Sequence, residues 1–252
     1  MRIAGRGRIV VWEGASLWVL AALDEQSGTD FHAHHAIQIT ISLDGGFVIR
    51  TADQCSAGPI TLVAADARHI FEAHGVAAFL FVEPESTAGR AIAEQWLARS
   101  SLAEPEPATF AAVISALRAR FDGDCPSSEL VAVGRDLVAA IADEGPAAPP
   151  DARVQAMIDF TRSNLDRPIT LNAAAASVFL SPSRARHLFA ANTGLPFKTF
   201  VLWQRLERAV ELYAMGRSLT EAAHEAGFAD SAHLSRTFRK TFGIPASMLE
   251  LA

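Results

Sequence analysis

Four polar residues in the first third of the chain have the types and spacing of a ligand-binding or metal-binding cluster. They are His32, His34, Gln38 and His69. A neutral imidazole offers one hydrogen-bond donor and one acceptor, and it also binds transition metals. The amide of Gln38 binds a metal more weakly than a carboxylate does. These residues are therefore expected to recognise either a small organic molecule or a metal ion.

Three interpretations of this cluster stay open. In the first, the four residues line a pocket that binds a small organic effector without a metal. In the second, His32, His34 and His69 ligate Zn or Fe in a structural or sensing site. In the third, the histidines are hydrogen-bonded residues near the mouth of a barrel and bind no ligand.

Polar residues on two helices in the last hundred residues have the types that contact DNA. The helical period buries the apolar residues of each helix and leaves the polar ones outside. The outward residues are Ser183, Arg184, Arg186 and His187 in the first helix, and His233, Ser235, Arg236, Arg239 and Lys240 in the second. Arginine can bridge guanine O6 and N7, histidine and serine can reach base edges, and lysine suits phosphate.

These two helices belong to two copies of one supersecondary unit. Residues of one type recur at an offset of 48 residues for the first pair and 49 for the others, namely Leu171 and Leu219, Phe189 and Phe238, Gly194 and Gly243, and Pro196 and Pro245. A constant offset is the signature of a structural repeat. Each copy reads as two short helices, and such a helix-turn-helix presents its second helix to a major groove.

Capping residues indicate where these helices begin. Thr170 can cap the first helix of the first copy, and Ser181, which precedes a proline, can cap the second. In the second copy, Ser218 and Glu221 have the spacing of a capping box, and Asp230 can cap the second helix. Apolar residues at helical spacing predict a connecting helix over residues 200–215. Because adjacent major grooves on one DNA face lie about 34 Å apart, we expect one chain to recognise two short base sequences roughly one turn of the double helix apart.

The last hundred residues closely resemble the AraC/XylS family of transcription regulators. Residues 227–243, GFADSAHLSRTFRKTFG, are similar to the family signature around its second reading helix. Further matches are Ser181, Leu188, Phe189 and Gly194 in the first copy, and Arg205, Leu206, Ala209 and Leu212 in the connecting helix. The resemblance covers roughly residues 152–248. It departs from the family at Ala246, where Pro is usual, and at Met248-Leu249, where Tyr-Arg is usual.

The resemblance implies base contacts at residues of both helices. They are Ser183, Arg186 and His187 in the first, and Ser231, Ala232, His233 and Arg236 in the second. Ala232 has no hydrogen-bonding group, so it can only touch an apolar group such as a thymine methyl. The implied partners are double-stranded promoter DNA, a small-molecule effector, a second copy of the chain and, as a further possibility, RNA polymerase.

Residues 8–85 read as short strands of an antiparallel barrel or sandwich. Residues 37–41 alternate at period two and end at the turn signal Asp44-Gly45-Gly46, after which a second strand follows. Apolar stripes at helical spacing then predict about three helices within residues 87–143. This half resembles a cupin barrel, and in metal-binding cupins a carboxylate stands where Gln38 is found. We therefore favour the metal-free effector pocket, with no cofactor, and do not expect a cupin-type enzyme.

The expected fold is α+β with two domains. Residues 1–143 would form a cupin-like β-barrel followed by helices, with effector-binding and dimerisation roles. Residues 144–151, which hold three prolines and a glycine, would form a linker. Residues 152–252 would form an all-α domain with two helix-turn-helix units joined by a long linker helix.

Charge is divided unevenly between the two halves. The net charge is −6 overall. Residues 1–150 hold 10 basic and 19 acidic residues (−9), and residues 151–252 hold 12 and 9 (+3). A polyanion responds to the local sign of charge, so the second half of the chain is the half suited to DNA.

The cysteines and the hydropathy predict the location of the protein. Cys55 and Cys125 do not have the spacing of a metal or redox site, and the sequence contains no apolar run of 18 residues that could span a membrane. A cytoplasmic location with reduced thiols is expected.

Overall fold

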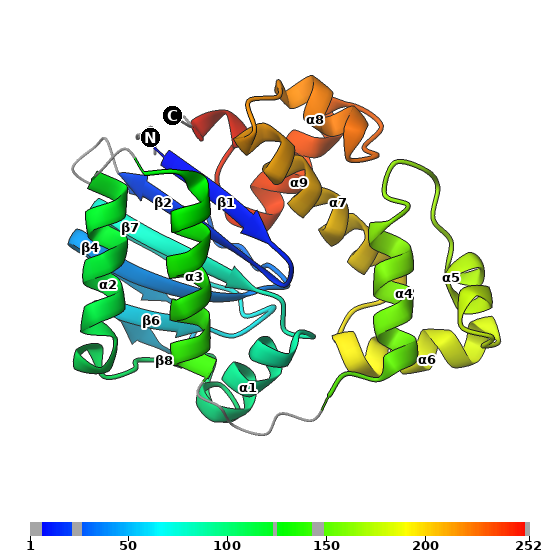
Figure 1. Cartoon of the computed structure of the whole chain (residues 1–252), viewed down its shortest axis with the longest axis horizontal. Coiled ribbons are helices and arrows are strands. Elements are labelled where there is room, and N and C mark those ends of the chain that lie inside the picture. The colour runs from blue at the N-terminus through cyan, green and yellow to red at the C-terminus, as the bar shows by residue number, and fades with distance from the viewer. Residues whose placement is uncertain (1–6, 22–26, 123–124, 143–148, 250–252) are drawn as a thin grey trace. The chain divides into compact units, whose positions relative to one another are not determined.

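The computed structural model describes residues 7–21, 27–122, 125–142 and 149–249 (Figure 1). The chain divides into two compact units. The first contains residues 1–147 together with 238–252, and the second contains residues 148–237. Residues 144–148 of the predicted linker, like the basic residues 1–6, lie outside the described part. Cys55 and Cys125 are free thiols.

The first unit is built on one antiparallel sheet. Its strands are β1 (Gly7–Trp12), β2 (Ala15–Ala21), β3 (Ser27–Gly28), β4 (Ile37–Arg50), β5 (Cys55–Ser56), β6 (Ile60–Val63), β7 (Ile70–Val82) and β8 (Leu102–Ala103). The main path runs β1-β2-β7-β4-β6-β8, while β3 pairs with β7 and β5 with β4. Within the described residues no pairing joins β1 to β8, so the strands form an open path and the predicted barrel closure is not seen.

The predicted turn at residues 44–46 is wrong, because β4 continues through it as one strand. Its register on β7 shifts between Ser42 and Asp44, and Gly45 then pairs with Gly75. Both glycines have positive φ, 72° and 83°. A Cβ on Gly45 would lie 2.3 Å from the carbonyl oxygen of His74. Glycines facing each other therefore let two long strands approach and bend where the local sequence reads as a reversal.

Three helices follow the strands, as the apolar stripes predict. They are α1 (Thr87–Trp96), α2 (Pro107–Asp122) and α3 (Ser127–Ala142). Helices α2 and α3 lie side by side across the strands (Figure 1). The core between the layers contains Leu17, Ile39 and Leu80 from the sheet and Leu117 and Leu137 from the helices, all fully buried.

The second unit is helical and carries the repeat. Its helices are α4 (Ala152–Arg162), α5 (Leu171–Ser177), α6 (Pro182–Thr193), α7 (Phe197–Ala214) and α8 (Leu219–Glu225), and most of α9 (Ser231–Phe242) also belongs to it. A single 3₁₀ turn, Ala246–Met248, follows. Helices α5 and α8 have 7 residues each, and α6 and α9 have 12 each. The two copies predicted from the 48- and 49-residue offsets are therefore confirmed as two helix pairs joined by α7.

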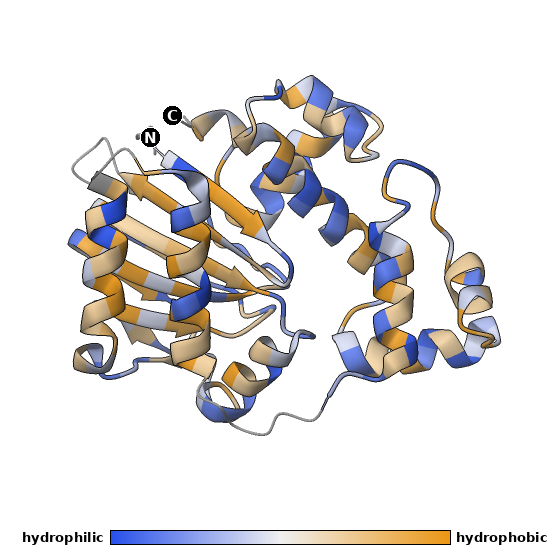
Figure 2. Cartoon of the chain, viewed as in Figure 1, coloured by the Kyte–Doolittle hydropathy of each residue, from blue (hydrophilic) through white to orange (hydrophobic). Residues whose placement is uncertain are grey.

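Hydropathy follows this architecture. The strands are mainly hydrophobic, whereas the helices mix hydrophobic and hydrophilic residues along their length (Figure 2). In the second unit, Met157, Phe189 and Phe200 from α4, α6 and α7 meet in one fully buried cluster. Among the described residues, no helix combines the length and the apolar character that a bilayer crossing requires.

Candidate functional site

The first helix pair is held by small residues and clear caps. Ala174 and Ala175 of α5 and Ala185 of α6 are fully buried, which allows the two helices to cross closely. The side chain of Ser181 accepts the main-chain N–H of Arg184 at 3.4 Å, and Gly194 ends α6 in the left-handed region. These features confirm the predicted start and end of this helix.

Helix α6 presents the predicted polar residues to solvent. Ser183, Arg184, Arg186 and His187 are all exposed. Phe189 on the opposite face is fully buried, and its ring lies 5.1 Å from those of Phe197 and Phe200. The aromatic contact anchors α6 to α7. The polar face of α6 is thus available to a ligand as large as DNA.

The second helix pair repeats this arrangement with different caps. Ser218 and Glu221 form the predicted capping box at the start of α8, and Asp230 accepts the main-chain N–H of His233 at 2.6 Å at the start of α9. Gly227, between the helices, has φ of 80°, and a Cβ there would lie 2.3 Å from the carbonyl oxygen of Leu165. Only glycine fits this close approach.

Helix α9 presents part of its predicted polar set to solvent. Ala232, Arg236, Arg239 and Lys240 are exposed, whereas Ser231, His233 and Ser235 are half-buried. The ring of His233 packs edge-on against Phe228, with centroids 5.2 Å apart. Leu234, Phe238 and Phe242 are buried, as the helical period predicts. Among the residues of α9 that are predicted to contact bases, Arg236 is therefore the exposed cation.

Hydrogen bonds tie the connecting helix α7 to α4 and to the segment that follows α4. It has 18 residues, so it is about 27 Å long. Arg162 of α4 donates to Gln204 at 2.9 Å, and Arg205 donates to the carbonyl oxygen of Arg167 at 2.9 Å. Its buried face includes Leu206, with 1% of its surface exposed. These contacts make α7 a rigid part of the unit.

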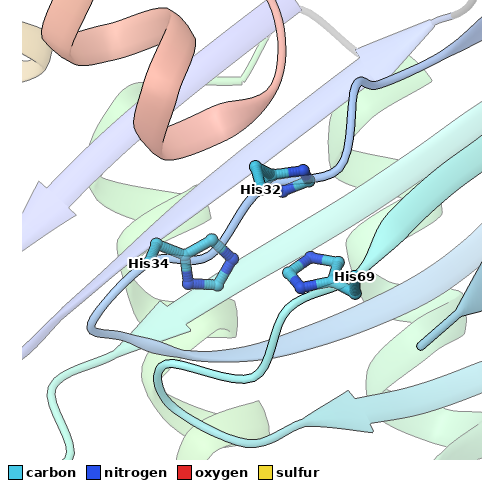
Figure 3. A group of neighbouring side chains, drawn as sticks. All are labelled: His32, His34 and His69. Carbon is cyan, nitrogen blue, oxygen red and sulfur yellow. The ribbon is translucent and has the colours of Figure 1, made fainter. Parts of the chain in front are cut away.

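In the first unit, the structure brings the three predicted histidines together. His32 and His69 form an isolated antiparallel bridge, and His34 follows two residues later. Their rings converge on a common space (Figure 3), and one ring nitrogen of each lies within 4.8 Å of the others. All three side chains are buried. Gln38, on β4, completes the cluster because its Oε1 lies 2.9 Å from His34 Nε2.

Each of the three rings uses Nδ1 to hydrogen-bond a main-chain carbonyl. The partners are Asp30 for His32, Ala36 for His34 and Ala67 for His69, all at 2.9 Å. Because a carbonyl only accepts, each Nδ1 carries the hydrogen. Burial, then the neighbouring His69, lowers the pKa of His32 to about 4. Burial, then His69 and His32, lowers the pKa of His34 to about 3, and burial also lowers the pKa of His69. The three imidazoles are therefore neutral near pH 7, with a lone pair on Nε2.

One of these lone pairs is left without a partner. His69 Nε2 is buried and makes no hydrogen bond among the described residues. An unsatisfied buried polar atom costs about 1–3 kcal/mol. The third interpretation, in which ordinary hydrogen bonds satisfy all the histidines, does not account for this atom.

A pocket adjoins the cluster within the first unit. Its lining is mostly apolar and aromatic, and it includes Trp18, Leu20, Thr29, His32, Gln38, Phe71, Ala73, Gly75, Ala77, Phe79, Phe81, Phe242 and Ile244. Of the four residues predicted to bind an effector, His32 and Gln38 thus belong to the wall. His34 and His69 lie in the cluster behind it.

Two comparisons place the helical segment among known proteins. Residues 174–250 match a family model described as a helix-turn-helix domain. A stretch of 81 residues is 37% identical to the bifunctional transcriptional activator/DNA repair enzyme Ada of Escherichia coli (strain K12) and covers 32% of this chain and 23% of that protein. Another of 94 residues is 31% identical to the HTH-type transcriptional regulator GbdR of Pseudomonas aeruginosa and covers 37% and 26%. The C-terminal segment is an AraC-type helix-turn-helix domain.

Solved structures resemble more of the chain than the AraC-type domain alone. ToxT from Vibrio cholerae O395 aligns with a TM-score of 0.59 at 10% identity, over 92% of this chain and 95% of that one. At this identity the likeness shows the fold, an α+β arrangement with an N-terminal sheet and the AraC-type domain after it. A second ToxT structure, with a TM-score of 0.51 at 11% identity over 93% and 95% of the two chains, holds an unsaturated fatty acid. The chain spans about a quarter of the length of Ada and of GbdR.

Sequence reasoning missed a cluster of charged residues within the first unit. His35 Nε2 lies 3.0 Å from Glu85, and both side chains are 3% exposed. Asp66 lies 3.5 Å from Nδ1 of the same ring. Burial alone would lower the pKa of His35, but hydrogen bonds to Asp66 and Glu85 and the charges of both carboxylates raise it to about 9. His35 and Glu85 are 50 residues apart, so no local pattern marks the pair.

Proposed function

We propose that this chain is a sequence-specific DNA-binding transcription regulator controlled by a small molecule bound in its N-terminal unit. The proposal rests on the two equivalent 12-residue helices of the repeat, α6 and α9, which both present exposed basic residues on their polar faces. The Ada and GbdR segments similar to this chain belong to proteins described as transcriptional regulators, which supports the same class of function. An enzymatic activity is not part of the proposal.

Individual residues receive roles from their chemistry. Arg186 and Arg236 contact guanine in the major groove, because a guanidinium can bridge O6 and N7. Lys240 and Arg184 contact phosphate, which positions each helix without reading sequence. The remaining contacts with base edges or backbone fall to Ser183, His187, Ser231, Ala232, His233 and Ser235. The DNA-binding domain in this proposal is residues 152–252, with α7 setting the spacing of the two readers.

The effector site is the pocket of the first unit. Trp18, Phe71 and Phe81 supply apolar surface to the pocket wall, while His32 and Gln38 supply hydrogen-bonding groups. Such a lining suits a molecule with an apolar body and a polar head. ToxT, which shares the fold, holds an unsaturated fatty acid in one of its structures. In this proposal the sheet is a cupin-like effector fold, and the helices over residues 87–143 also support a homodimer.

Control follows from linkage between the two binding events. An effector shifts the regulator only if it binds the DNA-competent state and the other state with different affinities. By reciprocity, promoter DNA then changes the affinity for the effector by the same factor. Contact with RNA polymerase at the promoter would be a further partner interaction of the same regulator.

Gel shifts with a library of genomic fragments test this function. We expect the full chain at moderate salt to retain a small subset of fragments, and excess nonspecific DNA to leave that subset bound. Uniform retention of all fragments, or none, would contradict the proposal. A variant with Arg186→Ala and Arg236→Ala together is the matched control, and it should retain the nonspecific fraction only.

A further inference from the structure

The three histidines of the cluster share a hydrogen-bond pattern that is characteristic of metal ligands. Each fixes its ring by donating Nδ1–H to a main-chain carbonyl two residues away. Metal-binding histidines commonly donate the nitrogen that faces away from the ion to a carbonyl or carboxylate, which sets the tautomer and the ring orientation. In all three rings Nε2 is consequently the nitrogen left to bind a ligand.

The cluster also holds an acceptor that needs a partner. His69 is fully buried, and its Nε2 has no hydrogen bond among the described residues. The ring of His69 lies beside the rings of His32 and His34, with centroids 4.2 and 5.1 Å apart. A neighbouring lone pair cannot satisfy it, because two acceptors repel each other. An electron-pair acceptor bound by all three nitrogens would satisfy this lone pair.

We propose that His32, His34 and His69 bind one divalent transition-metal ion, with Zn²⁺ as the reference case. Zn–N bonds of about 2.0–2.1 Å place tetrahedral ligand atoms about 3.3 Å apart. One ring nitrogen of each histidine lies within 4.8 Å of the others, so the rings need to close by roughly 1–2 Å. Side-chain rotation supplies this movement while the bridge between His32 and His69 keeps the main chain in place.

The donor set selects the class of ion. Imidazoles suit Zn²⁺, Cu²⁺, Ni²⁺ and Fe²⁺, whereas Mg²⁺ and Ca²⁺ require oxygen ligands. Three neutral imidazoles leave at least one coordination position, as in zinc sites that bind water or a substrate. His32 and Gln38 also line the pocket, so that position is left to water or to a polar group of a molecule bound there.

Gln38 belongs to the metal-free form of the cluster. His34 donates through Nδ1, so its Nε2 accepts, and the Gln38 amide must present its NH₂ group at the 2.9 Å contact. The other amide atom, its oxygen, then accepts from Thr40 at 2.8 Å. An ion would displace this amide from His34. The metal-free interpretation favoured from the sequence describes this state, and the unpartnered Nε2 of His69 favours the second interpretation.

Titration of the untagged, chelator-treated full chain with Co²⁺ tests the proposal without DNA. We expect visible d–d absorption that saturates at one ion per chain, and Zn²⁺ should abolish it by displacement. His69→Gln should weaken binding by at least about tenfold. His74→Gln, an exposed histidine of the same unit, should bind as the wild type does.

Three outcomes would overturn the proposal. They are no saturable absorption, a stoichiometry well below one ion per chain with both Co²⁺ and Zn²⁺, and equal weakening by His69→Gln and His74→Gln. If His69→Gln does not fold by circular dichroism, the wild type and His74→Gln still decide: metal should raise the melting temperature of both alike. Because these readouts involve no DNA, failure here leaves the regulator proposal intact, and failure of the gel shifts leaves this one intact.

Discussion

His32 and His69 face each other across an antiparallel bridge, with main-chain N···O distances of 3.0 and 2.9 Å. Their ring centroids lie 4.2 Å apart. The bridge joins segments that are 37 positions apart in the chain, so the two imidazoles are placed by the backbone rather than by a ligand. A site on paired backbone needs little reorganisation when a ligand binds.

Replacing Gln38 with Glu should tighten metal binding. A carboxylate beside His34 Nε2 adds an anionic ligand to three neutral ones, so we expect the Co²⁺ dissociation constant to fall by about tenfold or more. The metal-free variant should melt at a lower temperature than the wild type, because an unpaired carboxylate is buried. Melting curves with and without Zn²⁺ measure both effects. A smaller Zn²⁺-induced rise in melting temperature for Gln38→Glu than for the wild type would contradict the placement of Gln38.

Replacing Arg236 with Ala should relax specificity at one base pair. Loss of a bidentate contact with guanine costs about 1–3 kcal/mol on the cognate site. Competition assays with all single-base variants of the selected sequence measure this change. Arg167→Ala removes an exposed cation outside α6 and α9, so it controls for net charge and should leave base preference unchanged. Equal effects of the two substitutions would reduce Arg236 to a general electrostatic role.

Replacing Gly227 with Ala should disrupt the second helix pair more than the same change at Gly216. Both glycines have positive φ, 80° and 87°, so each alanine incurs roughly 1–2 kcal/mol of backbone strain. At Gly216 nothing lies within 4 Å of the added Cβ, whereas at Gly227 it would lie 2.3 Å from a main-chain oxygen. The difference in unfolding free energy isolates the clash. We expect Gly227→Ala alone to weaken DNA binding as well, and equal losses of stability would show that the close approach is unimportant.

Replacing Glu85 with Gln should destabilise the first unit more than replacing Asp66 with Asn. Glu85 is 3% exposed and lies 3.0 Å from His35, while Asp66 is 54% exposed and lies 3.5 Å away. A buried hydrogen bond between charged groups contributes on the order of 2 kcal/mol, and an exposed one much less. Both substitutions are isosteric, so chemical denaturation compares charge alone. The ranking would be reversed if solvent-exposed Asp66 were the main partner.

The sequence predicted the helix-turn-helix pairs because their signals are local. Ser181, Ser218 and Asp230 cap helices within three residues of themselves, and the glycines that end or separate helices need only their own φ. Helix α4 is the exception, because its N-cap residue Asp151 directly follows the two prolines that predict a linker. Its apolar residues nevertheless recur at helical spacing.

Features set by distant pairing were less predictable. Asp44-Gly45-Gly46 has the composition of a turn, and only Gly75 on the partner strand shows why the strand continues. His32 and His34 indicated a cluster with His69, but the carbonyl partners of their Nδ1 atoms, and the exclusion of His34 and His69 from the pocket wall, depend on tertiary placement. The partnership of His35 with Glu85 has the same origin.

Selection from random DNA duplexes tests most directly whether one chain contacts DNA with both α6 and α9. Full-length protein should enrich two short conserved blocks whose centres lie about 10 bp apart. Inserting about 5 bp between the blocks should sharply reduce affinity, because a half turn moves the second block to the opposite face of the duplex. Enrichment of one block only, or affinity that is indifferent to the insertion, would contradict the claim.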